Sequence, residues 1–475
     1  MLNDDLCFIS ATELSKLIRS KKISVQQLIQ AHLDQIERLN PTLNAIVTLT
    51  AESAMGEALI ADQKIQENAN VGLLHGLPVA HKDLLLTRGV RTTFGSLAFK
   101  DFVPDVDSLP VERLKKAGAI SLGKTNTPEF GAGSQTFNAV FGPTLNPYDL
   151  SKTCGGSSGG SAVALASGMV ALADGTDFGG SLRNPASFCN VVGIRPSPGR
   201  VPSWPESLGW YSLTVAGPMA RSVQDLALAM AAMSGPDDRS PISLEAPGDI
   251  FLQPLEKSFK NCKIAFSANL GGLPVEPEVA SVVESSRAIF QEIGCQVEND
   301  EPNIADADEI FLLWRAWRAE LRVTPLLDKY RKQLKDTVIW NAEQGLQITG
   351  PQLVRAEAKR TELYHRLREF FKKYDFLVLP TSQVAPFSID QEFPPEINGI
   401  KMNTYIEWQK SAYLISTLGN PAISVPAGFT NSGLPIGIQI VGRHRDDFGI
   451  LQLAHAFQKK TFFANRKPPI CNLVN

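Results

Sequence analysis

CGGSSGGS (residues 154–161) and GTDFGGSLRNP (residues 175–185) are the two stretches from which the fold and chemistry of this chain can be approached. Both are glycine-rich turns that carry serine, and they flank an apolar run with helical character. Glycine lets backbone amides approach a ligand closely, and successive amides then converge on a developing negative charge. The pattern predicts a nucleophile at Ser181. A flexible Gly/Ser linker is the weaker alternative, because Thr, Asp, Arg and Pro flank that serine tightly.

The amides around Ser181 and the base that would activate it can also be anticipated. The N–H groups of Gly179, Gly180 and Ser181 are placed to form an oxyanion hole, aided by a helix start at residues 184–185. The residues alone leave the identity of the base open. Among the six histidines only His81, which is adjacent to Lys82, is a candidate base. On a strand its side chain would point to the face opposite Lys82.

Lys82 follows a short strand-like run, residues 78–81, that we expect to be buried. Lysine acts as a base only when neutral, so burial would have to lower its pKa by about 3 units from ~10.4. The apolar neighbours of Lys82 in the sequence are suited to this. A surface lysine paired with Asp83 is the alternative that spacing alone leaves open.

Composition narrows the class of protein. The chain has 475 residues, of which 43% are apolar and 20% charged, as expected for a globular protein with a sizeable core. The formal net charge is −3 and the basic residues are scattered, so the sequence shows no basic patch of the kind that binds nucleic acid. The longest apolar stretch, residues 162–173, is too short to span a membrane. We expect neither a nucleic-acid partner nor membrane insertion.

Cysteine spacing and the N-terminus predict a cytoplasmic protein. The six cysteines lie far apart without C-x-x-C spacing, which argues against disulfides and structural zinc. Residues 1–8, MLNDDLCF, carry acids where a signal peptide would be basic. We expect no metal and no cofactor. A homodimer is one assembly that the sequence leaves open.

Helical and strand-like patterns alternate along the chain. Ser10 with Glu13 and then Ser24 open two N-terminal helices, and a third covers residues 51–68. Further helical patterns lie near 108–117, 158–169, 221–233, 276–292, 351–373, 404–416 and 446–460, and short β-rich runs lie at 119–122, 263–267, 376–379, 422–425 and 436–441. This alternation predicts an α/β fold with a large mixed, mostly parallel sheet covered by helices on both faces.

Three competing motifs receive less weight. Residues 118–125 match the P-loop pattern G-x-x-x-x-G-K-[ST], but the strand-like run falls inside the motif and Pro128 interrupts any following helix. Ser121 and Lys124 mimic a penicillin-binding S-x-x-K pair that would lie along a strand. Cys154 and Cys189 are interpreted as small packing residues.

The two serine turns resemble the amidase signature family, whose pattern runs G-G-S-S-G-G and then G-T-D-x-G-G-S-[IL]-R-x-P-A. Residues 155–160 and 175–186 match it, and residues 188–189, 193–196 and 433–439 (GLPIGIQ) are also similar. The resemblance covers nearly the whole chain and is greatest to free-standing bacterial-type amidases. It implies one amidase domain over residues 1–475, with helical cladding at 1–70, a signature core at about 75–235 and a substrate-pocket region at about 260–475.

The resemblance also implies roles for single residues. Ser181 would be the nucleophile, Ser157 a bridging serine after a cis peptide bond, and Lys82 the base. The amides of Phe178, Gly179, Gly180 and Ser181 would form the oxyanion hole. Ser158, Asp177 and Arg183 would be supporting residues, with Ser158 the one most easily mistaken for the bridging serine.

A serine-dependent hydrolase of a small-molecule amide is therefore the predicted function. The glutaminase component of a tRNA-dependent amidotransferase is the first alternative, weakened because residues 202–211 (PSWPESLGWY) replace the Arg-Tyr-Gly stretch typical of that component. Specificity for malonamide-type substrates is disfavoured, because Asn184 stands where the resemblance would place the arginine that binds a substrate carboxylate. A non-catalytic binding protein is the third hypothesis. Five aromatic residues are expected to offer apolar pocket walls, namely Trp204, Trp210, Tyr211, Trp314 and Trp317.

Overall fold

The chain is built around one large mixed β-sheet, seen in a computed structural model that describes residues 6–473. The prediction for residues 1–5 lies outside this range. In sheet order the strands are β1 (Ile46–Leu49), β3 (Ile120–Thr125), β2 (Pro78–Lys82), β6 (Leu172–Asp177), β8 (Val215–Ala220), β7 (Val192–Arg195), β14 (Ala422–Phe429), β15 (Pro435–Gly442), β11 (Phe376–Pro380), β9 (Lys263–Phe266) and β10 (Gln296–Asn299).

Parallel pairing lies towards the two ends of this sheet. β3, β2 and β6 run parallel to one another, as do β11, β9 and β10. The pairs from β6 through β8, β7, β14 and β15 to β11 are antiparallel, as is the edge pair of β1 with β3. The large mixed α/β sheet predicted from the sequence is confirmed, with its central part antiparallel.

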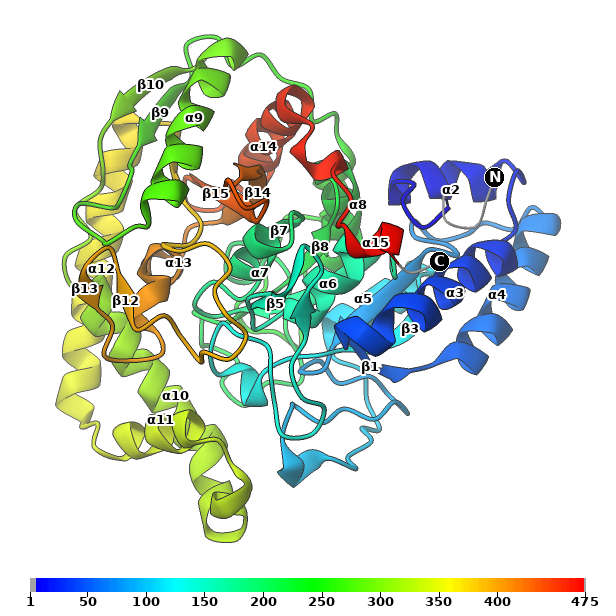
Figure 1. The fold of residues 1–475 in the computed structure, drawn as a ribbon, viewed down its shortest axis with the longest axis horizontal. Coiled ribbons are helices and arrows are strands. Elements are labelled where there is room, and N and C mark those ends of the chain that lie inside the picture. The colour runs from blue at the N-terminus through cyan, green and yellow to red at the C-terminus, as the bar shows by residue number, and fades with distance from the viewer. Residues whose placement is uncertain (1–5, 474–475) are drawn as a thin grey trace.

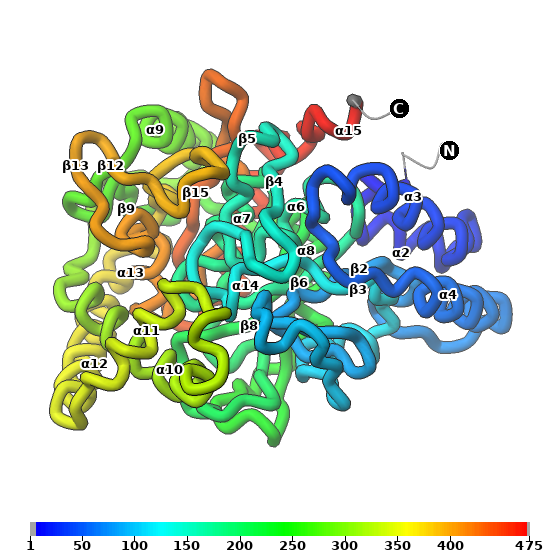
Figure 2. Tube along the Cα trace, turned by 60° about the horizontal axis from the view of Figure 1, so that its bottom comes forward, coloured from blue at the N-terminus to red at the C-terminus, as the bar shows by residue number. Residues whose placement is uncertain are grey.

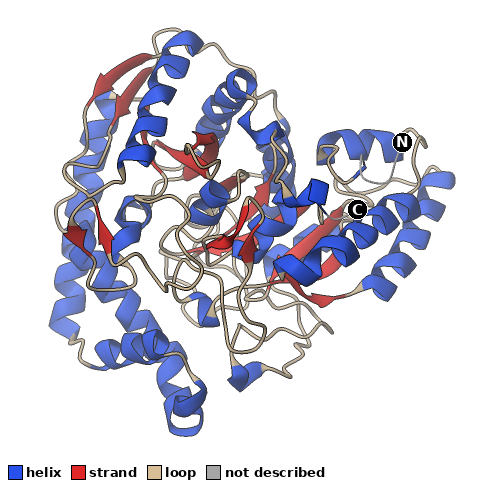
Figure 3. Ribbon diagram, in the orientation of Figure 1, coloured by secondary structure: helices blue, strands red, loops and turns tan. Residues whose placement is uncertain are grey.

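Helices surround the sheet on both faces (Figure 3). The described helices are α2 (Ala11–Arg19), α3 (Val25–Leu43), α4 (Ala51–Gln66), α5 (Leu109–Lys116), α6 (Gly159–Ala166), α7 (Arg183–Phe188), α8 (Val223–Met233), α9 (Pro277–Ile293), α10 (Ala307–Tyr330), α11 (Asp336–Leu346), α12 (Gly350–Lys373), α13 (Lys410–Leu418), α14 (Asp447–Thr461) and α15 (Ile470–Leu473). The inner strands are buried, as expected for a sheet covered on both faces, whereas the edge strands β1 and β10 are partly exposed.

The N-terminal helices clad one end of the molecule, and α10, α11 and α12 lie at the opposite end (Figures 1 and 2). The side chain of Ser10 accepts a hydrogen bond from the Glu13 amide at 3.2 Å, which caps α2. Ser24 and Gln27 form a reciprocal capping box at the start of α3. Both helix starts are confirmed as predicted.

The interval between the two serine turns differs from expectation. The predicted helix over 158–169 ends at Ala166, and β6 then runs from Leu172 to Asp177. The second serine turn therefore follows a buried strand. Because β2 lies between β3 and β6, the ends of β2 and β6 meet at one edge of the sheet.

Candidate active site

Lys82 is the last residue of β2 and is completely buried. Its Nζ lies 2.7 Å from Ser157 Oγ, 2.9 Å from Ser158 Oγ and 3.1 Å from Thr176 Oγ1. No carboxylate is within ion-pair distance of this amine among the described residues, so the alternative of a lysine paired with Asp83 does not hold. Asp83 instead accepts hydrogen bonds from the amide and hydroxyl of Thr93.

Burial lowers the pKa of Lys82 from its ordinary value of 10.5 to about 7, although the carboxylates of Asp177 and Asp174 act in the opposite direction. At a pKa near 7 about half of the molecules would carry the free amine at neutral pH, against fewer than about one in a thousand for an unperturbed lysine. The strand end thus supplies a lysine that can accept a proton.

The two serines after the glycine pair differ in what they face. Ser157 follows a cis peptide bond with Gly156 and lines a large cavity. Ser158, at the start of α6, is fully buried and directs its hydroxyl to the carbonyl of Thr176 at 3.4 Å. Both hydroxyls contact Lys82, but of the two serines only Ser157 also lines the cavity.

Ser181 stands in the turn between β6 and α7 and lines the same cavity. Its carbonyl accepts a hydrogen bond from the Ser158 amide at 3.1 Å, which ties the two serine turns together. Its hydroxyl has no hydrogen-bond partner within residues 6–473. Of the serines in the two glycine-rich turns, Ser181 is therefore the one whose hydroxyl is free to meet a molecule in the cavity.

The predicted oxyanion-hole amides divide into two groups. The Gly180 amide donates to Asp177 Oδ1 at 3.0 Å and so is already engaged. The amides of Phe178, Gly179 and Ser181 have no acceptor in the described part of the chain. Gly180 has a φ of +116°, and a Cβ there would lie 2.6 Å from Ala412, so this turn excludes any larger residue.

Asp177 anchors the turn from below. Its carboxylate accepts two bonds from Arg183, both at 3.0 Å, and one from Arg195 at 3.1 Å. It also accepts from the Leu182 amide at 3.2 Å. Burial alone would raise the pKa of Asp177, but the two guanidinium groups hold it well below its usual range. Asp177 and Arg183 thus hold the loop's shape without facing the cavity.

The C-terminal GLPIGIQ stretch joins the same network. Arg183 donates to Gln439 Oε1 at 2.8 Å, and the amide group of Gln439 donates to the carbonyl of Ser411 at 2.7 Å. β15 and α13, distant in sequence, therefore fix the position of α7 and of the serine before it.

Thr176 is a contact of Lys82 that sequence reasoning misses. The pattern indicates only that GTD flanks Ser181, whereas the structure makes this stretch the end of β6, beside Lys82 on β2. The missing signal is the strand itself, because the apolar run before Gly175 has the pattern of a single helix.

The rejected candidates have structural partners of their own. His81 is paired with a carboxylate, since its Nδ1 lies 2.5 Å from Asp174 Oδ2 and both side chains are buried. Lys124 of the P-loop-like stretch is inside β3, buried, and donates to Thr87 Oγ1 at 2.8 Å. Burial raises the pKa of the Cys154 thiol to about 12, which disfavours a thiolate nucleophile at that position.

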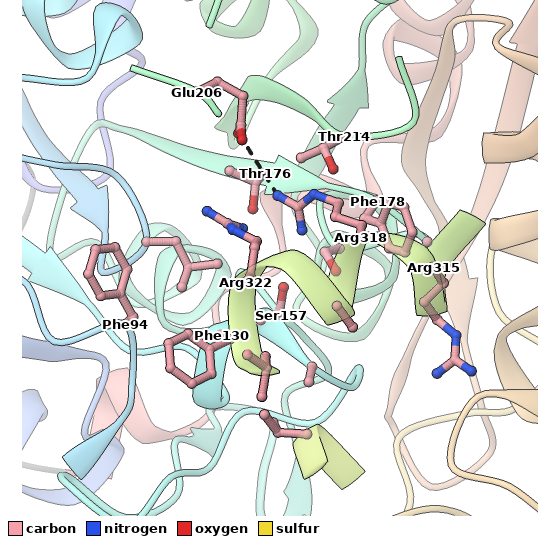
Figure 4. A pocket seen from close by; sticks show the side chains of 18 of the residues that line it. Phe94, Phe130, Ser157, Thr176, Phe178, Glu206, Thr214, Arg315, Arg318 and Arg322 are labelled. Atoms are coloured by element: carbon pink, nitrogen blue, oxygen red, sulfur yellow. Dashed lines mark ion pairs between the residues drawn. The ribbon is translucent and has the colours of Figure 1, made fainter. Parts of the chain in front are cut away.

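The cavity in front of the serines has a volume of about 620 Å³ and is bordered by α10 (Figure 4). Of the five aromatic residues expected in its walls only Trp204 lines it, while Trp210 is 78% exposed at the surface. Tyr211 stacks on Trp314 behind the wall. Phenylalanine rings take their place, namely Phe94, Phe99, Phe102, Phe130, Phe178 and Phe311.

Metal-binding clusters and membrane-spanning helices are both absent from the described residues. No group of three or more His, Cys, Asp or Glu side chains in this part of the chain could hold a metal ion. Within residues 6–473, no helix combines the length and hydrophobicity that crossing a membrane would require.

Comparison with known proteins places this geometry in a family. The family model described as Amidase matches residues 27–451. The chain belongs to the amidase family. It is 34% identical over 470 residues to an acylamidase of Rhodococcus erythropolis, with 98% of each chain covered. The structure of a bacterial aryl acylamidase superposes with a TM-score of 0.91 at 30% identity, covering 96% of this chain and 98% of that one.

A second kind of relative has a different role. The chain is 35% identical over 490 residues to a component of the glutamyl-tRNA(Gln) amidotransferase of Moorella thermoacetica, covering 98% of this chain and 99% of that one. The structure of such a component from Thermotoga maritima superposes less closely, with a TM-score of 0.72 at 27% identity over 96% of this chain and 95% of that one. The acylamidase likenesses therefore fit this chain better. It is an amidase, a hydrolase that acts on amide carbon–nitrogen bonds other than peptide bonds.

Proposed function

We propose that this amidase works through an acyl-enzyme on Ser181, with Lys82 as the base and Ser157 as the proton relay. The observation that carries the proposal is the contact of buried Lys82 with Ser157, at 2.7 Å, where Ser157 shares a cavity with the unbonded hydroxyl of Ser181. Ser157 and Ser181 lie in the two turns that match the family's pattern, and Lys82 lies in the segment upstream of them. A lysine with a pKa near 7 is suited to this role at neutral pH.

The reaction would run in two halves. Neutral Lys82 takes the proton of Ser157 as Ser157 takes that of Ser181, whose oxygen attacks the amide carbonyl. The amides of Phe178, Gly179 and Ser181 stabilise the oxyanion. The proton then returns through Ser157 to the leaving nitrogen, the C–N bond breaks, and water hydrolyses the resulting ester by the same relay. Gly180 is left out because its amide already serves Asp177.

We further propose a small carboxylic amide with an aromatic or medium-sized apolar group as the substrate. Three phenylalanines support this, because the ring of Phe99 contacts those of Phe94 and Phe130 edge to face and all three line the cavity. The acylamidase and aryl acylamidase likenesses support the same class. The spacing of the thiols in the sequence supports a cytoplasmic location.

The glutaminase alternative is less favoured because of one segment. Residues 203–207 line the cavity and lie within the stretch where this chain departs from the amidotransferase component. Purification tests the choice. We expect a monomer or homodimer that turns over simple amides without a second protein or tRNA. Co-purification of a second protein together with tRNA-dependent use of glutamine would favour the alternative.

A sulfonyl fluoride probe tests the nucleophile. We expect one adduct per chain, located on Ser181 by peptide mass mapping, and none in the Ser181→Ala variant. Ser157→Ala should label slowly because the relay is broken. Ser158→Ala is the matched comparison and should label faster than Ser157→Ala, since Ser158 does not reach the cavity. An adduct that persists in Ser181→Ala would sink the assignment.

The pH dependence of hydrolysis tests the base. The pKa of Lys82 is lowered to about 7 and only its neutral form accepts a proton, so kcat/KM for an anilide should rise with pH and level off above about pH 7 to 8. Lys82→Arg keeps the positive charge but cannot lose its proton, so this variant should be inactive across this pH range. If Lys82→Ala retained the same rising limb, the titrating group would lie elsewhere.

A further inference from the structure

α10 presents three arginines to the cavity. Arg315, Arg318 and Arg322 are spaced by three and four residues, which places them on one face of the helix, and all three line the cavity. Figure 4 shows Arg318 and Arg322 projecting from this helix into the space near Thr176, whereas Arg315 projects away from them.

The three guanidinium groups differ in their partners. Arg315 donates to Tyr405 at 2.9 Å and to Asn341, and it packs on the ring of Trp340. Arg318 has its nearest carboxylate, that of Glu206, at 3.9 Å. Arg322 forms neither a hydrogen bond nor an ion pair within residues 6–473, and its side chain is exposed to the cavity.

The charges lining the cavity are unbalanced. Glu206 is the single acidic residue among the described lining residues, against three arginines, which leaves two positive charges in excess. Repulsion from Arg318 is the largest influence that lowers the pKa of Arg322, to about 10, and Glu206 opposes it. Like charges side by side are unfavourable unless an anion joins them. An anion placed between Arg318 and Arg322 would remove that cost.

On the basis of the proposed amide hydrolysis, we propose that Arg322, with Arg318, binds a carboxylate carried by the substrate. The guanidinium group matches a carboxylate through two parallel hydrogen bonds. Apolar rings such as Phe94 and Phe130 line the same cavity and would hold the rest of the molecule. The substrate class is thus an amide with an apolar or aromatic body and one anionic group.

The anionic group can sit on either side of the scissile bond, and matched substrates separate the two cases. For the amine side the pair is 4-acetamidobenzoate and 4′-methylacetanilide. For the acyl side it is succinanilate and butyranilide. In one of the pairs we expect the wild-type enzyme to prefer the anionic member in kcat/KM by roughly tenfold or more, mainly through KM. Because that preference rests on an ion pair, it should shrink as KCl rises.

Variants test Arg322 directly. In Arg322→Gln the ratio of kcat/KM for the anionic and neutral members should fall by roughly 10- to 100-fold, the size of one or two charge-assisted hydrogen bonds. Arg322→Lys should recover part of the ratio. Arg355→Gln removes the same charge from an exposed position on α12 that does not line the cavity, and it should leave the ratio unchanged.

The outcomes are distinguishable from failure of the proposed function. If neither member of any pair is hydrolysed in a Ser181-dependent way, the amidase assignment on these residues fails. The carboxylate site is overturned if neutral anilides are hydrolysed without any preference for the anionic member. It is also overturned if Arg322→Gln lowers kcat/KM equally for both members of a pair. The wild-type preference alone decides the matter should Arg322→Gln not fold.

Discussion

Replacing Ser181 with alanine is expected to lower kcat for amide hydrolysis by about 10⁴- to 10⁶-fold, the range found when a nucleophile is removed from a unit of this kind. Ser157 cannot take the place of Ser181, because it is already bound to Lys82 and lies outside the turn that carries the free amides. The fold should be unaffected, since the Ser181 hydroxyl makes no hydrogen bond within residues 6–473. An amide hydrolysis assay measures the loss of kcat, and a thermal melt checks that the fold is unaffected.

A double variant sharpens this test. Residues that act as one relay show strongly non-additive losses. Ser181→Ala combined with Lys82→Ala should therefore be no slower than Ser181→Ala alone. If the fold-loss of the double variant equalled the product of the two single losses, Lys82 and Ser181 would serve different steps. If Ser181→Ala kept activity near that of the wild type, the proposed acyl-enzyme on Ser181 would be wrong.

The position of Lys82 shows how much the sequence could predict. A short apolar run bounded by turn residues predicts a buried strand, and a lysine at the end of such a strand must be desolvated. β2 ends at Lys82, which is fully buried. The spacing does not reveal its partners, because Thr176 comes from a neighbouring strand and meets Lys82 only once the sheet is formed.

The segment that carries the arginines shows what the sequence could not predict. The periodicity predicts no helix over residues 307–346, although α10 and α11 occupy most of this segment. Pro325 stands inside α10, and the arginines on its cavity side interrupt the apolar stripe that marks a helix covering a core. A charged face turned towards a cavity looks, in sequence, like a solvated surface.

The oxyanion-hole prediction from the sequence is limited because a backbone amide in the turn can be taken by an acceptor within the protein. Successive glycines make amides available, but sequence does not say which acceptor each amide meets. Asp177 takes the amide of Gly180, and its neighbours are left for a ligand. Backbone hydrogen bonds in a turn depend on dihedral angles that only the folded loop shows.

Removing the carboxylate of Asp177 is expected to lower the free energy of unfolding by about 3 to 5 kcal/mol, because the change leaves the buried guanidinium groups of Arg183 and Arg195 without their anion. It also frees the Gly180 amide, so kcat should fall because the turn is no longer held. Chemical denaturation and amide assays of Asp177→Ala measure the two effects.

The effect of Asp177 should depend on pH in a defined direction. Its carboxyl has a pKa well below the ordinary value of 3.8, so the folded state binds fewer protons than the unfolded state in acid. The stabilisation is complete above about pH 4 and is lost as the pH falls below it. The difference between wild type and Asp177→Asn should therefore narrow in acid.

A matched surface pair provides the control. Arg331 and Glu343 form an ion pair with both side chains about half exposed, so Glu343→Ala should cost less than about 1 kcal/mol at any pH. If Asp177→Ala cost no more than Glu343→Ala, the buried arginines would have to be stabilised by their carbonyl partners alone, and Asp177 would not anchor the turn.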